Sequence, residues 1–115
     1  MRAAIRCIVV ALALVVLAPQ VGAHERGGGS SVATQVARVR IIDFAFRPRN
    51  LTIARGTVVR WVNRGARTHT TTSNTGLWNH NLAPGETFGR SFRRMGTFAY
   101  HCSIHPQMTG RITVT

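Results

Sequence analysis

The sequence predicts an all-β fold of short strands, a β-sandwich or barrel. From Gln35 onward the chain consists of short runs rich in Val, Ile, Thr and aromatic residues. Gly, Pro and Asn separate these runs, and these residues favour tight turns. No run in this part of the chain keeps helical spacing of its apolar residues for more than about two turns. These three observations favour strands throughout the domain.

Four strands are expected in the first half of the domain. Val36–Ile42 alternates apolar residues with Arg, and Leu51–Ile53 is a short apolar run between turns. Thr57–Asn63 places Trp61 on the face opposite to its Arg side chain, because side chains alternate along a strand. Thr70–Ser73 is rich in Thr, a β-branched residue that is common in strands.

Three more strands are expected in the second half. Glu86–Phe92 follows a Pro-Gly turn, Gly96–His101 alternates aromatic with small residues, and Arg111–Thr115 alternates apolar with polar residues. The period of two then assigns side chains to the core. The predicted core residues are Val39, Ile41, Phe44, Phe46, Val59, Trp61, Phe88, Phe98, Tyr100, Ile112 and Val114.

The composition limits the kind of protein this can be. The chain has 115 residues, which is the length of one domain, and its hydrophobic fraction of 44% excludes intrinsic disorder on composition. Two Cys residues are too few for a disulfide scaffold. All 15 basic residues are Arg, and against 3 acidic residues they give a net charge of +12. Such a charge favours acidic partners.

The first 23 residues resemble a secretory signal peptide. Arg2 and Arg6 precede an apolar run, Cys7–Ala18, and small residues end at Ala23. The apolar run is shorter than the about 20 residues that span a membrane, although retention as an anchor remains an alternative. We therefore expect a Sec-type signal peptide cleaved after Ala23, export to the periplasm or the extracellular space, and no transmembrane segment in the mature chain. Residues 24–34 read as a flexible Gly/Ser tether, and 35–115 as the folded domain.

Cleavage would leave Cys102 as the single thiol of the exported chain, in an oxidising compartment. Such a thiol must be buried and inert, form a disulfide with another chain, or bind a ligand that protects it. Cys102, His105 and Met108 follow the spacing C-x2-H-x2-M. Thiolate and thioether are soft ligands and imidazole suits copper, whereas zinc sites rarely use Met. The segment therefore predicts a copper site.

A second His is needed to complete a trigonal ligand set, and the candidates are His24, His69, His80 and His101. His101 precedes Cys102 in a strand and points to the opposite face, and His24 lies in the tether. His80 lies in a polar segment with turn-forming neighbours. His69 opens a Thr-rich strand that can lie beside the Cys102 end of a neighbouring strand. His69 is the preferred choice and His80 the reserve; whether His24 or His80 binds additional metal stays open.

Five stretches in order resemble the cupredoxins, specifically the plastocyanin/amicyanin group of type 1 copper proteins. They lie between residue 37 and the C-terminus. They are Asp43-Phe44-Ala45-Phe46-Arg47-Pro48, the strand Gly56 to Asn63, Thr68-His69-Thr70, Leu82-Ala83-Pro84-Gly85-Glu86-Thr87-Phe88, and the segment from Tyr100 to Gly110.

The resemblance implies a Greek-key β-sandwich of about seven to eight strands and a role for each of the site residues. His69, Cys102 and His105 would form the equatorial plane around one Cu(I)/Cu(II) ion, with Met108 as the weak axial ligand. Thr70 and Asn63 would support the ligands, although Thr68 and Thr70 replace the Pro and Asn that flank the first His in plastocyanins. His105 would be the electron port, beside Ile104 and Pro106 in an apolar docking patch.

The expected function is that of an exported blue copper protein that carries single electrons and is not an enzyme, because no ligand position is open for a substrate. A copper storage or delivery protein is the main alternative, and a structural or adhesive sandwich without metal is a third possibility. The expected partners are redox proteins with acidic docking surfaces, and the expected state is a monomer. Nucleic acid is not expected as a partner of an exported protein.

Overall fold

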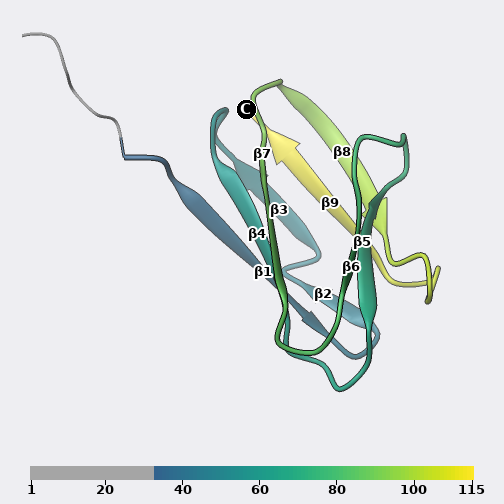
Figure 1. Ribbon diagram of the computed structural model, residues 1–115. Coiled ribbons are helices and arrows are strands. Elements are labelled where there is room, and N and C mark those ends of the chain that lie inside the picture. The colour runs from purple at the N-terminus through teal and green to yellow at the C-terminus, as the bar shows by residue number, and fades with distance from the viewer. Residues whose placement is uncertain (1–32) are drawn as a thin grey trace, which may run out of the picture. The chain divides into compact units, whose positions relative to one another are not determined.

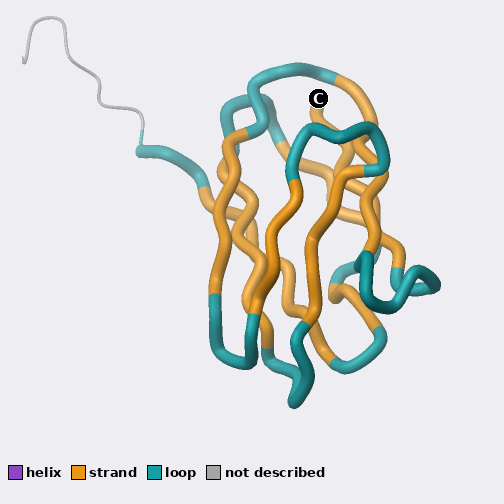
Figure 2. The backbone as a smooth tube through the Cα atoms, turned by 45° about the vertical axis from the view of Figure 1, so that its right-hand side comes forward, coloured by secondary structure: helices purple, strands orange, loops and turns teal. Residues whose placement is uncertain are grey.

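The computed structural model describes residues 33–115, which form two β-sheets packed face to face (Figure 1). One sheet has the order β2-β1-β4-β7 and the other the order β3-β9-β8-β5-β6. Figure 2 shows these strands joined by loops, with no helix in the described part of the chain. The nine strands are β1 Val36–Ile42, β2 Ala45–Arg47, β3 Asn50–Ile53, β4 Val58–Asn63, β5 His69–Ser73, β6 Asn79–Leu82, β7 Thr87–Ser91, β8 Gly96–His101 and β9 Thr109–Val114.

Both sheets are mixed. β1 pairs with β4 in parallel and β3 pairs with β9 in parallel, while the other strand pairs are antiparallel. The pairing of β5 with β8 matters most for the site, because it places His101 opposite Thr72. The residues that flank these two strands are thereby brought to the same end of the sandwich.

Aromatic rings fill the space between the sheets. Trp61 in β4 is fully buried, and its ring centroid lies 5.5 Å from that of Tyr100 in β8 and 5.8 Å from that of Trp78. Phe92 packs 5.5 Å from Trp78. Large rings bury much apolar area per residue, which helps a small domain reach a stable core.

The predicted all-β sandwich is confirmed, and its strands differ from the predicted ones in two places. Every predicted strand has a counterpart, but β2 and β6 were not predicted. β2 has only three residues, too short to show an alternation. The segment around His80 was taken as a polar loop because of its Asn residues, yet it pairs with β5 as an edge strand. Backbone hydrogen bonds hold it there, and its first three side chains are exposed.

The core prediction needs one correction and several additions. Phe44 was assigned to the core, but it is 52% exposed, because it lies in the tight turn between β1 and β2 with φ at +69°. A turn interrupts the strand alternation on which the assignment rested. Phe88 and Phe98 are only partly buried and pack against the edge of the core. Buried residues that the alternation missed are Ile53, Trp78, Leu82, Phe92 and Met108.

No helix in the described part of the chain is long and apolar enough to span a membrane. The predicted signal peptide, most of the predicted tether, Cys7 and His24 lie outside the described residues.

Candidate metal centre

Three side chains with metal-binding atoms converge at one end of the sandwich. His69 begins β5, Cys102 directly follows β8, and His105 lies in the loop between β8 and β9. Their ligand atoms all lie within 4.8 Å of one another. The antiparallel pairing of β5 with β8 brings the start of one strand beside the end of the other, so residues distant in sequence meet here.

The distances within this group suit a metal ion at its centre. Cys102 Sγ lies 4.0 Å from His69 Nδ1 and 3.8 Å from His105 Nδ1. Bonds of about 2.3 Å to sulfur and 2.0–2.1 Å to nitrogen at trigonal angles place the two ligand atoms about 3.8 Å apart. The three side chains are therefore spaced as a trigonal ligand set.

Met108 is held next to this group by the backbone of its own loop. The Cys102 N–H donates to the Met108 carbonyl at 3.0 Å, and the Met108 N–H donates to the His105 carbonyl at 2.9 Å. Its side chain is 1% exposed and belongs to the buried core. The loop is thus closed on itself, and it brings a thioether to the same end as the other three residues.

Thr70 contacts the Cys102 loop twice. Its backbone N–H donates to Cys102 Sγ at 3.3 Å, and its hydroxyl accepts the Ser103 N–H at 2.7 Å. Thr70 therefore ties β5 to the loop after β8.

Asn63 fixes the loop that delivers His69. Its side chain is fully buried; Nδ2 donates to the carbonyls of Arg67 and Leu82 at 2.8 Å each, and Oδ1 accepts the Gly65 N–H at 2.9 Å. The bonds to Arg67 and Gly65 hold residues 64–68, between β4 and β5, and the bond to Leu82 ties Asn63 to the end of β6. Asn63 itself is not part of the convergent group.

Asp43 is the residue at this site to which sequence reasoning gave no role. One carboxylate oxygen lies 2.9 Å from Nε2 of the fully buried His69. The hydrogen bond with His69, followed by that from the Ala66 N–H, holds the pKa of Asp43 below its usual value. The available signal was its place in the motif before Phe44 and the rarity of acidic residues in this chain.

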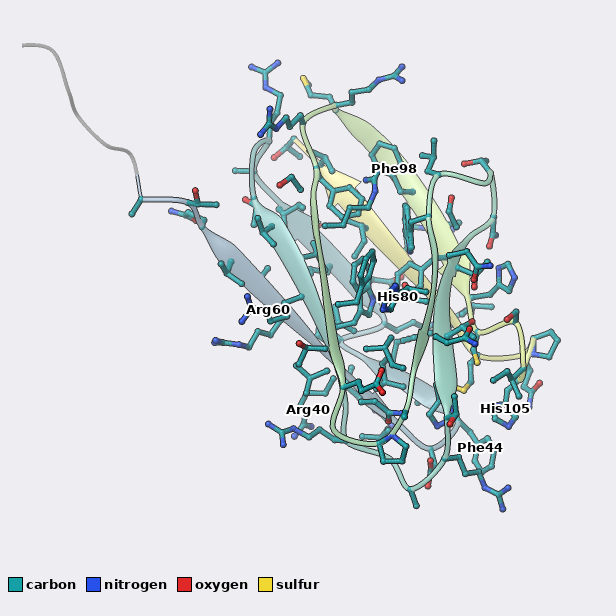
Figure 3. All side chains as sticks on the ribbon, in the orientation of Figure 1. Arg40, Phe44, Arg60, His80, Phe98 and His105 are labelled. Atoms are coloured by element: carbon teal, nitrogen blue, oxygen red, sulfur yellow. The ribbon has the colours of Figure 1, made fainter. Side chains whose placement is uncertain are left out.

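The surface over the group is small and apolar. His105 is partly buried, and the exposed Phe44 ring meets it edge-on with centroids 5.1 Å apart. Ile104 is 50% exposed and Pro106 is exposed beside it. We call these four residues the His105 patch. Figure 3 shows Phe44 and His105 together at one end, with Arg40 and Arg60 directed away from the sandwich on another side.

The other described His residues lie outside the group. His80 is exposed on β6 and stacks on Phe88 with ring centroids 4.4 Å apart. His101 Nδ1 is 2.6 Å from Asn74 Oδ1 at the surface side of β8. The structure thus brings His69, the preferred choice from sequence, next to Cys102.

Comparison with known proteins agrees with this fold and this site. The family described as "Cupredoxin-like domain" matches residues 6–114, nearly the whole chain. The chain belongs to this cupredoxin-like family. It is 28% identical over 91 residues to amicyanin of Paracoccus denitrificans. The matched region covers 74% of this chain and 70% of amicyanin.

Two solved structures place this cupredoxin among its relatives. A purple cupredoxin from Nitrosopumilus maritimus is 31% identical with a TM-score of 0.65, over 69% of this chain and 99% of that protein. A copper-containing nitrite reductase from Thermus scotoductus is 29% identical with a TM-score of 0.63, over 69% of this chain but only 22% of that enzyme. The resemblance to the enzyme therefore concerns a cupredoxin-sized part of it.

The residues of this cupredoxin fit the type 1 copper of its relatives. Two imidazoles, one thiol and a nearby thioether are the donors that distinguish such a site from an oxygen-rich site for a hard cation. Two members of the group, His69 and Cys102, are also fully buried and thus shielded from solvent. The spacing of the ligand atoms suits a metal ion, and the chemistry of the donors favours copper.

Proposed function

We propose that this cupredoxin is a single-electron carrier whose copper is held by His69, Cys102 and His105, with Met108 as the axial ligand. The observation that carries the proposal is the burial of the site. Among these four side chains, His69, Cys102 and Met108 are at most 1% exposed, and His105 alone is partly exposed. An electron can pass through such a site, whereas a substrate has no open place to bind.

Bound copper would supply the Cu(II)/Cu(I) couple. The chain's contribution is to hold the ligands still in both oxidation states. Thr70 holds Cys102, Asn63 holds the loop before His69, and the backbone of the Cys102 loop holds Met108. Because these hydrogen bonds do not depend on the metal's charge, little rearrangement is expected when an electron arrives.

The His105 patch is the proposed entry and exit point for electrons. It is small and apolar, which suits the limited and short-lived interfaces of redox encounters. Arg67 lies beside it, with its guanidinium carbon 5.9 Å from the Phe44 ring centroid. We propose that redox partners with acidic docking surfaces approach this end, steered by the excess of Arg over acidic residues in the domain.

We further propose that the protein is exported and acts as a monomer. The signal-peptide pattern of residues 1–23 supports export. The proposal that it is not an enzyme rests on the burial of the proposed ligands, which leaves a substrate no open ligand position.

Loading the purified protein with Cu(II) and recording its visible spectrum tests the proposal. Wild type should become intensely coloured and should lose and regain its colour on reduction and reoxidation. Cys102→Ser should remove the colour because the thiolate is gone, and His69→Ala should remove it while His80→Ala, on exposed β6, preserves it.

A wild type that stays colourless after loading with Cu(II) would refute the proposal. Fast release of Cu(I) to a chelator without a coloured oxidised form would indicate copper delivery instead. Absence of any specific metal binding would indicate a structural sandwich. Loss of colour in His80→Ala but not in His69→Ala would show that the ligand assignment is wrong.

A further inference from the structure

The buried His69 ring touches a charged group on the side away from Cys102. A neutral imidazole carries its proton on one nitrogen and a lone pair on the other. Nδ1 faces Cys102 Sγ at 4.0 Å, and Nε2 is 2.9 Å from Asp43 Oδ1. A metal at the site needs the lone pair of Nδ1, so the proton must sit on Nε2. A carboxylate can only accept a hydrogen bond, and it therefore favours this tautomer.

The Asp43 carboxylate is itself held in place. The N–H groups of Ala66 and Arg67 donate to its two oxygens at 3.2 and 3.3 Å. Together with His69, three donors converge on one side chain. These donors fix the position of the carboxylate that faces Nε2 of His69.

Gly65 provides the space for this arrangement. A Cβ on Gly65 would collide with Asp43 Oδ1, the oxygen that faces His69. The close approach of the 64–68 loop to the β1–β2 turn thus depends on the missing side chain. Gly65 offers a way to displace the carboxylate without removing it.

We propose that Asp43 is a positioning residue of the copper site, which fixes the tautomer and orientation of His69 and stabilises the higher oxidation state of the metal. The inference rests on the proposed ligand role of His69. The mechanism is that of carboxylate–histidine–metal arrangements, in which the carboxylate makes the imidazole a stronger donor. A negative charge one ring away from the metal also favours Cu(II) over Cu(I), since Cu(II) carries the larger charge.

NMR of the metal-free protein tests the tautomer. Long-range ¹H–¹⁵N couplings in the His69 ring should show a proton on Nε2 in wild type. In Asp43→Asn the amide can present either its oxygen or its NH₂ group to Nε2. The Nδ1-protonated tautomer should then become populated. Glu86→Gln removes the same charge from an exposed side chain in the β6–β7 turn and should leave the couplings unchanged.

The reduction potential of the copper-loaded protein tests the second effect. Asp43→Asn should favour Cu(I) over Cu(II) by about tenfold more than wild type does, a rise of about 59 mV for one electron. Gly65→Ala should raise the potential in the same direction, because it displaces the carboxylate. Glu86→Gln should raise it by much less, because its exposed charge does not contact His69 and is screened by solvent.

Three results would overturn the inference. They are a proton on Nδ1 of His69 in metal-free wild type, an unchanged single tautomer in both Asp43→Asn and Gly65→Ala, and a potential shift no larger than that of Glu86→Gln. The NMR experiment needs no copper, so it decides the role of Asp43 even if the protein proves not to be an electron carrier. If Asp43→Asn does not fold, wild type and Gly65→Ala still give a result.

Discussion

Tyr100 places an ionisable phenol in the aromatic core. It is fully buried, and its ring lies 4.7 Å from Phe46 and 5.5 Å from Trp61, centroid to centroid. Burial penalises the phenolate and raises the pKa of Tyr100 to about 12. Because an unfolded Tyr ionises near pH 10, the folded state binds more protons than the unfolded state between these values.

The stability of the domain should therefore fall as the pH rises from about 10 to about 12. The loss attributable to Tyr100 is about 2–3 kcal/mol, and it is absent below pH 10, where both states are protonated. Urea unfolding at several alkaline pH values measures it. Tyr100→Phe removes the ionisable group and should flatten this part of the profile; an equally steep fall in the variant would contradict the assignment.

Two neighbouring residues of the β1–β2 turn, Asp43 and Phe44, contact the two His residues of the site. The positive φ of Phe44 turns its ring outward over His105, while the preceding Asp43 side chain reaches His69. A non-Gly residue in this region of φ is uncommon. The β1–β2 turn thus provides part of the proposed docking surface and part of the support for a proposed ligand.

At the scale of elements, the 64–68 loop determines where His69 lies. It joins the two sheets, from β4 in one to β5 in the other, and Asn63 is its main anchor. The loop carries two exposed Arg side chains and little apolar surface of its own, so its position depends on hydrogen bonds rather than on packing.

Asn63→Ala should destabilise the protein by about 2–4 kcal/mol, because it removes three hydrogen bonds and leaves buried backbone groups without partners. It should also weaken copper binding, since the loop before His69 loosens. Thermal unfolding and copper titration measure the two effects. Asn81→Ala, at an exposed position of the edge strand β6, should change stability by less than about 0.5 kcal/mol. Equal effects of the two substitutions would refute the anchoring role.

At the scale of the whole molecule, the proposed copper ligands connect parts of the chain that are far apart in sequence. His69 precedes Cys102 by 33 residues, and the two belong to neighbouring strands. A metal that binds only the folded chain stabilises it by mass action, by about 4 kcal/mol at a thousand times its dissociation constant. A small domain buries little apolar surface, so a metal that joins two distant segments adds a large share of its folding stability.

Copper removal should accordingly lower the melting temperature. For a domain of this size, about 4 kcal/mol corresponds to a decrease of roughly 15–30 °C. Calorimetry of the loaded and the chelator-treated protein measures the difference, and reloading should restore it. Cys102→Ser should melt at one temperature with or without copper. A wild type that melts at the same temperature in both states would show that the site does not hold the metal tightly.

The sequence by itself determined the fold class and the cluster at its C-terminal end. Alternation predicted β1 and the first part of β4 well because there one face lies in the core and the other toward solvent, as the buried Val59 and Trp61 and the exposed Arg60 show. Cys102, His105 and Met108 were visible because they lie within one loop and their chemistry is distinctive. Sequence patterns were sufficient to predict features that depend only on residues close together in the chain.

The tertiary structure alone decided the features that depend on contact between distant segments. Asp43 lies 26 residues before His69, and only the packing of the β1–β2 turn against the 64–68 loop brings them together. The strand around His80 forms because β5 offers it backbone partners, which no side-chain pattern encodes. The outward direction of Phe44 follows from one backbone angle in a turn. Backbone pairing and through-space contact arise from the folded chain as a whole, which is why residue patterns could not reveal them.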